Sequence, residues 1–375
     1  MQIKVLHLIS TLDVGGAEQN LFRLVTSMDK GAYENIVVCM TAPGIMGRRI
    51  EQAGIPVHSL KMRKGTPEIS AAFRLRFTAN IFKPDIIQCW MYHANVMGLT
   101  ISRRYPILWN IRCSDMDLTQ YGLVYRFAVM AGARLSGIPQ MVVSNSFAGM
   151  EAHKRLGYHP RKWVIIPNGF DTMTFKTDPD ARSLIRADLG IPNDALTLGL
   201  IGRFDPMKDH ATFFSAATLF SKSHPDTHFI IAGKGITDQN PTIRGYLGAA
   251  PDPEKFHLLG ERDDIPYILA SLDIATSSSS SEGLPNAIGE AMACGIPCVA
   301  TDAGDTGLLL GDTGLLVSRR SPRNLCVAWE RLAQMGPEAR GEMGSRARER
   351  IMQFYSQDRA TRSYEKLYQE IIESQ

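Results

Sequence analysis

Short apolar runs that alternate with helical periodicities constrain the fold of this chain more than any other feature. Each run is followed by enough residues to form a helix that crosses back over a sheet. The runs in the first half are Ile3–Ile9, Ile36–Met40, Val57–Leu60, Ile86–Trp90, Ile107–Ile111, Met141–Val143 and Trp163–Ile166. Such repetition is typical of βα winding around a parallel sheet, so the sequence predicts an α/β fold.

The second half repeats this alternation after a polar interruption. Residues 167–171 read Pro-Asn-Gly-Phe-Asp, and residues 177–180 read Thr-Asp-Pro-Asp, a composition typical of a domain boundary. The later runs are Leu198–Ile201, Phe229–Ala232, Phe256–Leu259, Ile274–Thr276, Cys298–Thr301 and Leu315–Val317. A chain of 375 residues is also too long for one core. We therefore predict two Rossmann-like domains, residues 1–172 and 173–355.

The last segment, residues 356–375, has the pattern of an amphipathic helix. Its apolar side chains recur at the spacing of one helical face, at Tyr364, Leu367, Tyr368, Ile371 and Ile372. We expect this helix to cover part of a core.

The near-neutral net charge hides an asymmetry between the two halves. Residues 1–172 carry 20 Lys and Arg against 11 Asp and Glu, which gives +9, and the remainder carries 21 against 27, which gives −6. A basic domain suggests an anionic partner, although charges scattered over a solvated surface would give the same balance.

Cysteine spacing and hydropathy favour a cytoplasmic protein. The six cysteines are scattered, and Cys294 and Cys298 have neither a CxxC nor a zinc-knuckle spacing, so we expect reduced thiols. No run approaches the roughly 18 apolar residues of a membrane-spanning helix. The apolar start Ile3–Ile9 lacks a charged lead and a cleavage site, so we interpret it as a strand and not as a signal peptide.

Candidate site residues follow the apolar runs, because parallel α/β sheets bind ligands beyond the carboxyl ends of their strands. Gly15 and Gly16 open a helix, where the backbone can approach a phosphate and free N–H groups attract anions. The pattern is not GxGxxG, and a Gly-Gly turn is also common without a ligand. His93 follows the run Ile86–Trp90 and is a candidate by position, although a lone histidine is usually structural.

A second candidate is the loop that begins the second domain. Arg203 and Lys208 lie five positions apart in Gly-Arg-Phe-Asp-Pro-Met-Lys, directly after the run Leu198–Ile201. Two cations on one ligand-side loop suit a diphosphate, with arginine as a fork and lysine as a point charge. Alternatively, they are solvated loop charges.

The most informative string runs from Ser277 to Pro297. Pro285 suits the first turn of a helix and Gly295 its end, which predicts a helix from about Pro285 to Ala293 with unpaired N–H groups at its start. Glu282 and Glu290 would lie about 12 Å apart if the intervening residues were helical. That distance is comparable to the reach from ribose to hexose across a diphosphate, and a carboxylate can accept hydrogen bonds from vicinal hydroxyls.

At these residues the chain resembles the retaining glycosyltransferases of family four, and the resemblance covers nearly its full length. The string from Glu282 to Glu290 is the most specific part. The resemblance implies the GT-B fold, in which two Rossmann-like domains with parallel sheets face each other across a cleft. It also implies that the C-terminal helix, residues 356–375, crosses back to the N-terminal, acceptor-side domain.

The resemblance implies a role for each candidate residue. Glu290 would bind the nucleotide ribose, Glu282 the donor sugar, and His93 would lie beside the transferred sugar. The residues expected to contact the donor are Gly15, Gly16, Arg203, Lys208, Arg262, Glu282, Gly283, Leu284, Pro285, Asn286 and Glu290. Those expected to take part in the chemistry are Glu282, His93, Arg203 and Lys208.

Weaker matches place Leu259–Arg262 near the base and Gly233–Gly235 in a nearby turn. Asp115 and Asp117 form a DxD triplet like that of metal-dependent GT-A enzymes, but the rest of the chain predicts two Rossmann-like halves. We therefore expect no metal site and no cofactor, with the nucleotide diphosphate sugar as co-substrate.

The chemistry implied by the resemblance has two routes. Breaking a sugar–phosphate bond develops negative charge on the diphosphate, so fixed cations and N–H donors lower the barrier. Retention can use Glu282 as a nucleophile in a double displacement, or front-face attack in which the departing phosphate takes the acceptor proton. The resemblance favours the front-face route, and the sequence leaves both open.

Three other functions remain alternatives. A GT-B nucleotide-sugar epimerase or a non-catalytic nucleotide-sugar-binding protein would have similar donor contacts. An NAD-dependent dehydrogenase is disfavoured because Gly15 and Gly16 lack the dinucleotide spacing.

The acceptor is expected to contact the basic N-terminal domain. Its cations include Arg48, Arg49, Lys61, Arg63, Lys64, Arg74, Arg76, Arg103 and Arg104. The apolar segment from Tyr121 to Gly137 suits either anionic lipid headgroups or an interior crossover helix. We expect transfer of a hexose or N-acetylhexosamine, from UDP, to a lipid-linked or polysaccharide acceptor in cell-surface glycan synthesis. This implies peripheral contact with the inner face of the membrane and no nucleic-acid partner.

Overall fold

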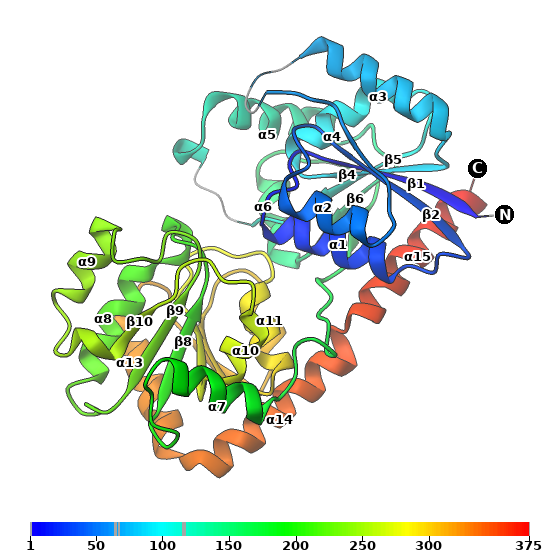
Figure 1. The fold of residues 1–375 in the computed structure, drawn as a ribbon. Coiled ribbons are helices and arrows are strands. Elements are labelled where there is room, and N and C mark those ends of the chain that lie inside the picture. The colour runs from blue at the N-terminus through cyan, green and yellow to red at the C-terminus, as the bar shows by residue number, and fades with distance from the viewer. Residues whose placement is uncertain (1, 64–65, 67, 115–117, 375) are drawn as a thin grey trace. The chain divides into compact units, whose positions relative to one another are not determined.

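The computed structural model describes residues 2–63, 66, 68–114 and 118–374 (Figure 1). The chain forms two compact units, one of Met1–Gly169 with Gln357–Gln375 and the other of Phe170–Ser356. The first boundary therefore lies just before the expected Thr172. Phe170 explains this position, because its ring is fully buried in the core of the second unit, against Gly289.

The first unit contains a seven-stranded parallel sheet with the order β3-β2-β1-β4-β5-β6-β7. Its strands are β1 (Ile3–Ile9), β2 (Tyr33–Cys39), β3 (Val57–Ser59), β4 (Ile86–Trp90), β5 (Ile107–Ile111), β6 (Met141–Ser144) and β7 (Trp163–Ile165). Its helices are α1 (Gly16–Ser27), α2 (Gly44–Gln52), α3 (Ile69–Phe82), α4 (Tyr92–Gly98), α5 (Leu123–Leu135), α6 (Phe147–Arg155) and α15 (Gln357–Glu373).

Two hydrophobic cores sandwich this sheet. Side chains of α1, α2 and α15 share one core, and side chains of α3, α4 and α5 share the other. In α15, Tyr364, Leu367, Tyr368 and Ile371 are buried, and Asn110 donates a hydrogen bond to the Tyr364 hydroxyl at 2.6 Å. The terminal helix thus completes the core of the first unit.

The second unit contains a six-stranded parallel sheet with the order β10-β9-β8-β11-β12-β13. Its strands are β8 (Thr197–Ile201), β9 (His228–Ala232), β10 (Phe256–Leu258), β11 (Ile274–Ser277), β12 (Cys298–Thr301) and β13 (Gly314–Val317). Its helices are α7 (Pro179–Asp188), α8 (His210–Phe220), α9 (Pro241–Leu247), α10 (Ile265–Ala270), α11 (Asn286–Ala293), α12 (Thr306–Leu310), α13 (Pro322–Gln334) and α14 (Gly336–Phe354).

The structure confirms the prediction of an α/β fold with two Rossmann-like domains. Every predicted apolar run overlaps a strand, and both sheets are parallel throughout. All six cysteines are free thiols. Within the described ranges, no helix combines the length and apolar character needed to cross a membrane.

Candidate functional site

Two adjacent loops at the carboxyl edge of the second sheet bring together two of the candidate residues of that unit, Lys208 and Glu282. Strands β8 and β11 pair in parallel, so the loops that follow them leave the sheet side by side. The Ser280 N–H donates to the Met207 carbonyl at 2.8 Å, and the Ser278 hydroxyl donates to the Lys208 carbonyl at 2.8 Å. These bonds fix the short helix η3 (Pro206–Lys208) against the segment that carries Glu282.

Lys208 and Glu282 form an ion pair at the centre of this arrangement. The Lys208 Nζ atom lies 2.5 Å from Glu282 Oε1, and the Ser279 hydroxyl donates to the same oxygen at 2.7 Å. The two ionic side chains are 24% and 13% exposed, so their attraction is screened less than that of a surface pair. The structure thus joins two residues that the sequence analysis selected separately, and adds Ser279, which it did not select.

Arg203 lies on the same loop but has a partner of its own. Its Nε and Nη2 atoms both donate to Asp205 Oδ2, at 3.0 and 2.8 Å, and its side chain is half-exposed. Asp205 Oδ1 accepts the Met207 N–H at 2.9 Å and so caps η3. Partial burial acts to raise the pKa of Asp205, but the Met207 N–H and the Arg203 guanidinium outweigh it, so the pKa lies below its ordinary value.

Sequence reasoning did not select Asp205, the partner of Arg203. The available signal was its position directly before Pro206, since aspartate followed by proline is a common helix start. Asp205 accepts hydrogen bonds from Nε and Nη2 of Arg203. To bind an anionic ligand through these two atoms, Arg203 would have to give up its hydrogen bonds to Asp205 or divide them between Asp205 and the ligand.

Helix α11 begins one residue later than predicted. Pro285 is the N-cap and has an extended backbone, with φ −74° and ψ 112°, so the first helical residue is Asn286. Glu282 lies before the helix, as predicted, and residues 282–285 are not helical, so the spacing of about 12 Å for a continuous helix does not apply to Glu282 and Glu290. Glu290 lies in the second turn of α11 and is 7% exposed.

The segment between β11 and α11 is held in place by the backbone of Gly304 and Asp305, which lies close against it. The Asp305 N–H donates to the Gly283 carbonyl at 2.9 Å. Gly304 has φ +61°, and a Cβ atom there would lie 1.9 Å from the Glu282 carbonyl oxygen. Only glycine fits at this position, so Gly304 helps to set the path of the Glu282 segment. Gly283, Leu284 and Pro285 are buried.

Arg262 lies at the same edge of the sheet, after β10. It forms a two-bond fork with Asp264, at 2.8 and 2.6 Å, which raises the pKa of Arg262 and lowers that of Asp264. The Gly233 N–H donates to the Gly260 carbonyl at 2.7 Å, which ties the loops after β9 and β10 together.

The first unit places Gly15, Gly16 and His93 at the carboxyl ends of neighbouring strands, β1 and β4. Gly15 is the N-cap of α1 and Gly16 its first residue. A Cβ atom on Gly15 would lie 2.4 Å from Glu18 Oε2, so the Glu18 carboxylate occupies the space beside this turn. The Thr11 hydroxyl donates to Glu18 Oε1 at 3.0 Å.

His93 is the second residue of α4 and is partly buried. Its ring centroid lies 5.6 Å from that of Tyr125 in α5. Burial lowers the pKa of His93, so the imidazole is neutral at neutral pH. A neutral ring in this position can donate or accept a hydrogen bond without adding charge.

The part of the chain that the structure describes holds no group of three His, Cys, Asp or Glu side chains that could bind a metal ion. Asp115 and Asp117, the DxD triplet considered above, lie outside the described residues.

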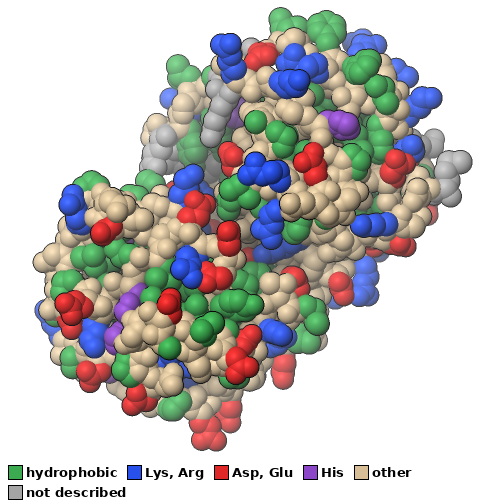
Figure 2. Space-filling view, in the orientation of Figure 1, with side chains coloured by type: hydrophobic (Ala, Val, Ile, Leu, Met, Phe, Trp, Pro, Cys, Tyr) green, Lys and Arg blue, Asp and Glu red, His purple; other side chains and the backbone are tan. Residues whose placement is uncertain are grey.

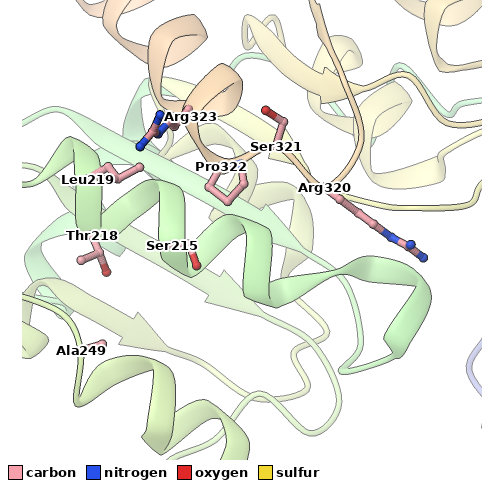
Figure 3. A pocket seen from close by; sticks show the side chains of 8 residues that line it. All are labelled: Ser215, Thr218, Leu219, Ala249, Arg320, Ser321, Pro322 and Arg323. Carbon is pink, nitrogen blue, oxygen red and sulfur yellow. The ribbon is translucent and has the colours of Figure 1, made fainter.

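A pocket of about 510 Å³ lies elsewhere in the second unit, between α8 and the start of α13 (Figure 3). Its lining residues are Ser215, Thr218, Leu219, Ala249, Arg320, Ser321, Pro322 and Arg323. It contains none of the candidate residues, and Figure 3 shows the Arg320 side chain extending away from the serine and threonine side chains of α8.

Known families match both units of the chain. Residues 14–173 match the family described as Glycosyltransferase Family 4, and residues 195–335 match Glycosyl transferases group 1. The chain is similar to the Escherichia coli enzyme named UDP-Gal:alpha-D-GlcNAc-diphosphoundecaprenol alpha-1,3-galactosyltransferase, with 31% identity over 42% of this chain and 41% of that protein. It is 22% identical to the putative glycosyltransferase EpsF of Bacillus subtilis over 92% of this chain and 95% of EpsF.

A solved structure shares the whole fold. The Anabaena protein HepE, crystallised in complex with UDP-glucose, superposes with a TM-score of 0.85 at 22% identity and covers 100% of both chains. The likeness in fold thus extends over the full length of this chain, whereas the sequence match to the Escherichia coli galactosyltransferase covers only 41% of that enzyme.

Proposed function

Because the chain belongs to the family 4, group 1 glycosyltransferases, we propose that it transfers a hexose or N-acetylhexosamine from a UDP-sugar to a lipid-linked or polysaccharide acceptor. The observation that carries the proposal is the Lys208–Glu282 pair at the carboxyl edge of the second sheet. The pair combines a cation that can bind a diphosphate with a carboxylate that can accept hydrogen bonds from sugar hydroxyls. It lies at the carboxyl edge of a parallel sheet, where proteins of this fold class bind their ligands.

The names of the relatives support this choice of donor and acceptor. The Escherichia coli relative is named as a UDP-galactose-dependent enzyme that acts on a diphosphoundecaprenol-linked sugar. The Anabaena relative was crystallised with UDP-glucose. By analogy, we propose that this chain also uses a UDP-sugar as donor and a lipid-linked molecule as acceptor. It would then help to assemble cell-surface glycans from the cytoplasmic side of the membrane.

In the proposed mechanism the protein, without a metal ion, stabilises the departing diphosphate. Lys208 supplies a point charge, Arg203 a fork released from Asp205, and the first N–H groups of α11 supply further donors. These groups act where negative charge grows as the sugar–phosphate bond breaks. The Glu290 carboxylate would accept hydrogen bonds from the ribose.

We propose that the reaction retains the anomeric configuration by front-face attack. Glu282 Oε1 already accepts hydrogen bonds from Lys208 and Ser279, which favours a role in orienting the sugar over a role as nucleophile. His93 would hydrogen-bond the transferred sugar. The diphosphate would lie beside Gly15 and Gly16 after the Glu18 carboxylate has moved away from this turn.

A release assay with a panel of nucleotide sugars tests the proposal. We expect UDP release from one UDP-sugar that is accelerated by acceptor, continues in the presence of EDTA, and yields a product of unchanged anomeric configuration by NMR. Accumulation of a 2-epimer from donor alone would instead identify an epimerase. Donor binding without release, under any acceptor condition, would identify a binding protein.

A further inference from the structure

One helix of the first unit is apolar on two opposite faces. Ala71, Leu75 and Ala79 of α3 are buried against the sheet. Four further apolar side chains of the helix form an exposed stripe with a spacing of four residues: Ile69, Phe73, Phe77 and Ile81, with exposures of 82%, 70%, 67% and 68%. We call this set the α3 stripe. A helix that is apolar all round normally has both faces covered, whereas α3 has one face in the core and one in solvent.

The α3 stripe is long and continuous. Residues spaced by four lie on one side of a helix, so the stripe extends about 18 Å along the axis from Ile69 to Ile81. Scattered exposed apolar residues are normal on a protein surface, but a contiguous row of two phenylalanines and two isoleucines marks an interaction site.

The charges beside the stripe are positive. Helix α3 contains no Asp or Glu, and Arg76 and Lys83 are exposed next to the stripe. Arg104 contacts the same helix, since it donates a hydrogen bond to Asn80 Oδ1 at 2.9 Å. Figure 2 shows hydrophobic and basic side chains interspersed over the region that Figure 1 labels α3. Glu68, the residue before the helix, is paired with Arg74 at 3.3 Å.

Helix α5 adds a second surface of the same kind. It packs into the same core, on the same face of the sheet, through Ala128 and Val129. Its Leu123, Phe127 and Met130 side chains are exposed, as is Arg126. The segment Tyr121–Gly137 is therefore a crossover helix whose second face remains apolar and basic, so both interpretations of it from the sequence remain compatible with the structure.

We infer that the α3 stripe docks on an anionic lipid bilayer, with the phenylalanines in the headgroup–acyl boundary and the flanking cations on the headgroups. A second copy of the chain is a poorer occupant, because two copies of one stripe would bring their cations together. This inference names the surface by which the protein would attach to the membrane. It rests on the proposed function in one respect only, that the acceptor is linked to a lipid.

Vesicle flotation tests this inference with the full chain. We expect binding to vesicles that contain phosphatidylglycerol, weaker binding to pure phosphatidylcholine vesicles, and a decrease with rising salt. The double variant Phe73→Gln/Phe77→Gln should lose affinity by about 100-fold, because burial of each phenylalanine side chain contributes about tenfold. The matched control Leu184→Gln/Val327→Gln removes two equally exposed apolar side chains of α7 and α13 and should bind like the natural protein.

Fluorescence of Phe77→Trp gives a direct readout of insertion. Its emission should shift to the blue with anionic vesicles and be quenched by brominated acyl chains. The inference is overturned if the natural protein does not float at low salt, if the double variant floats equally well, or if the stripe variants instead abolish a dimer in the absence of lipid. Donor turnover without vesicles should be unchanged in the double variant, so a failure of the docking inference is distinguishable from a failure of the proposed activity.

Discussion

The Lys208 ammonium and the Glu282 carboxylate, 74 residues apart in the sequence, meet at 2.5 Å between the loops that follow β8 and β11. Each group satisfies the charge of the other when no donor is bound. In the proposed complex, the diphosphate would share Lys208 with Glu282, and the sugar hydroxyls would approach the carboxylate. The pair would therefore link the diphosphate and the sugar, the two groups joined by the bond that breaks.

Glu290 tests the binding part of this arrangement. We predict that Glu290→Gln raises the KM for the donor by about tenfold or more, because hydrogen bonds to a charged acceptor contribute about 1.5–3 kcal/mol each, and leaves kcat within a few-fold. Steady-state kinetics at varied donor concentration measure both constants. Because Glu290 is buried, a thermal melt should accompany the kinetics. A fall in kcat at unchanged KM would contradict a ribose-binding role.

Buried histidines should make stability depend on pH. Desolvation lowers the pKa values of His7, His153 and His210 to about 4. The unfolded chain therefore binds more protons than the folded chain between about pH 4 and pH 6.5. We predict that the free energy of unfolding falls as pH decreases through this window, by up to about 1.4 kcal/mol per pH unit for each histidine, and is flat with respect to these groups above it.

Urea denaturation at pH 7 and at pH 5 measures this dependence. His210→Phe removes one of the three titrating groups, the imidazole that packs beside the Phe204 ring. The variant should show a smaller change in the free energy of unfolding between pH 7 and pH 5, without an equal loss of stability at pH 7. The same slope in this variant and in the natural protein would exclude His210 as a contributor.

Gly289 should be required for the position of Phe170. A Cβ atom on Gly289 would lie 2.0 Å from the Phe170 ring, so Gly289→Ala should destabilise the second unit by about 1–3 kcal/mol. Gly341→Ala is the matched control, because that glycine lies within α14 and a Cβ atom there meets nothing within 4 Å. The control should be neutral or more stable by up to about 1 kcal/mol. Equal effects of the two substitutions on thermal melting would contradict the packing argument.

The strands were predictable because parallel strands buried on both faces are apolar along most of their length. Ile86–Trp90 and Ile107–Ile111 were predicted to the residue. The convergence of Lys208 and Glu282 was also accessible, because loops at the carboxyl ends of strands share one edge of a sheet.

Other features depend on contacts that a sequence does not display. The Arg203–Asp205 ion pair is local, and in the sequence these two residues look like ordinary charged loop residues. The start of α11 depends on the extended backbone of Pro285, which the sequence alone does not show. The exposed face of α3 was missed because a helix with apolar residues on both sides gives no amphipathic signal. Only the packing of Ala71, Leu75 and Ala79 on the sheet reveals which face is left in solvent.

UDP release by Lys208→Ala, measured beside the natural protein with the best donor at saturation, tests the central claim most directly. Loss of a charge partner for the leaving diphosphate should lower kcat by about 100-fold or more, while Lys222→Ala, which removes an exposed lysine after α8, should have no effect. Unchanged turnover in the Lys208 variant would contradict the assignment of this sheet edge as the place where the donor bond is broken.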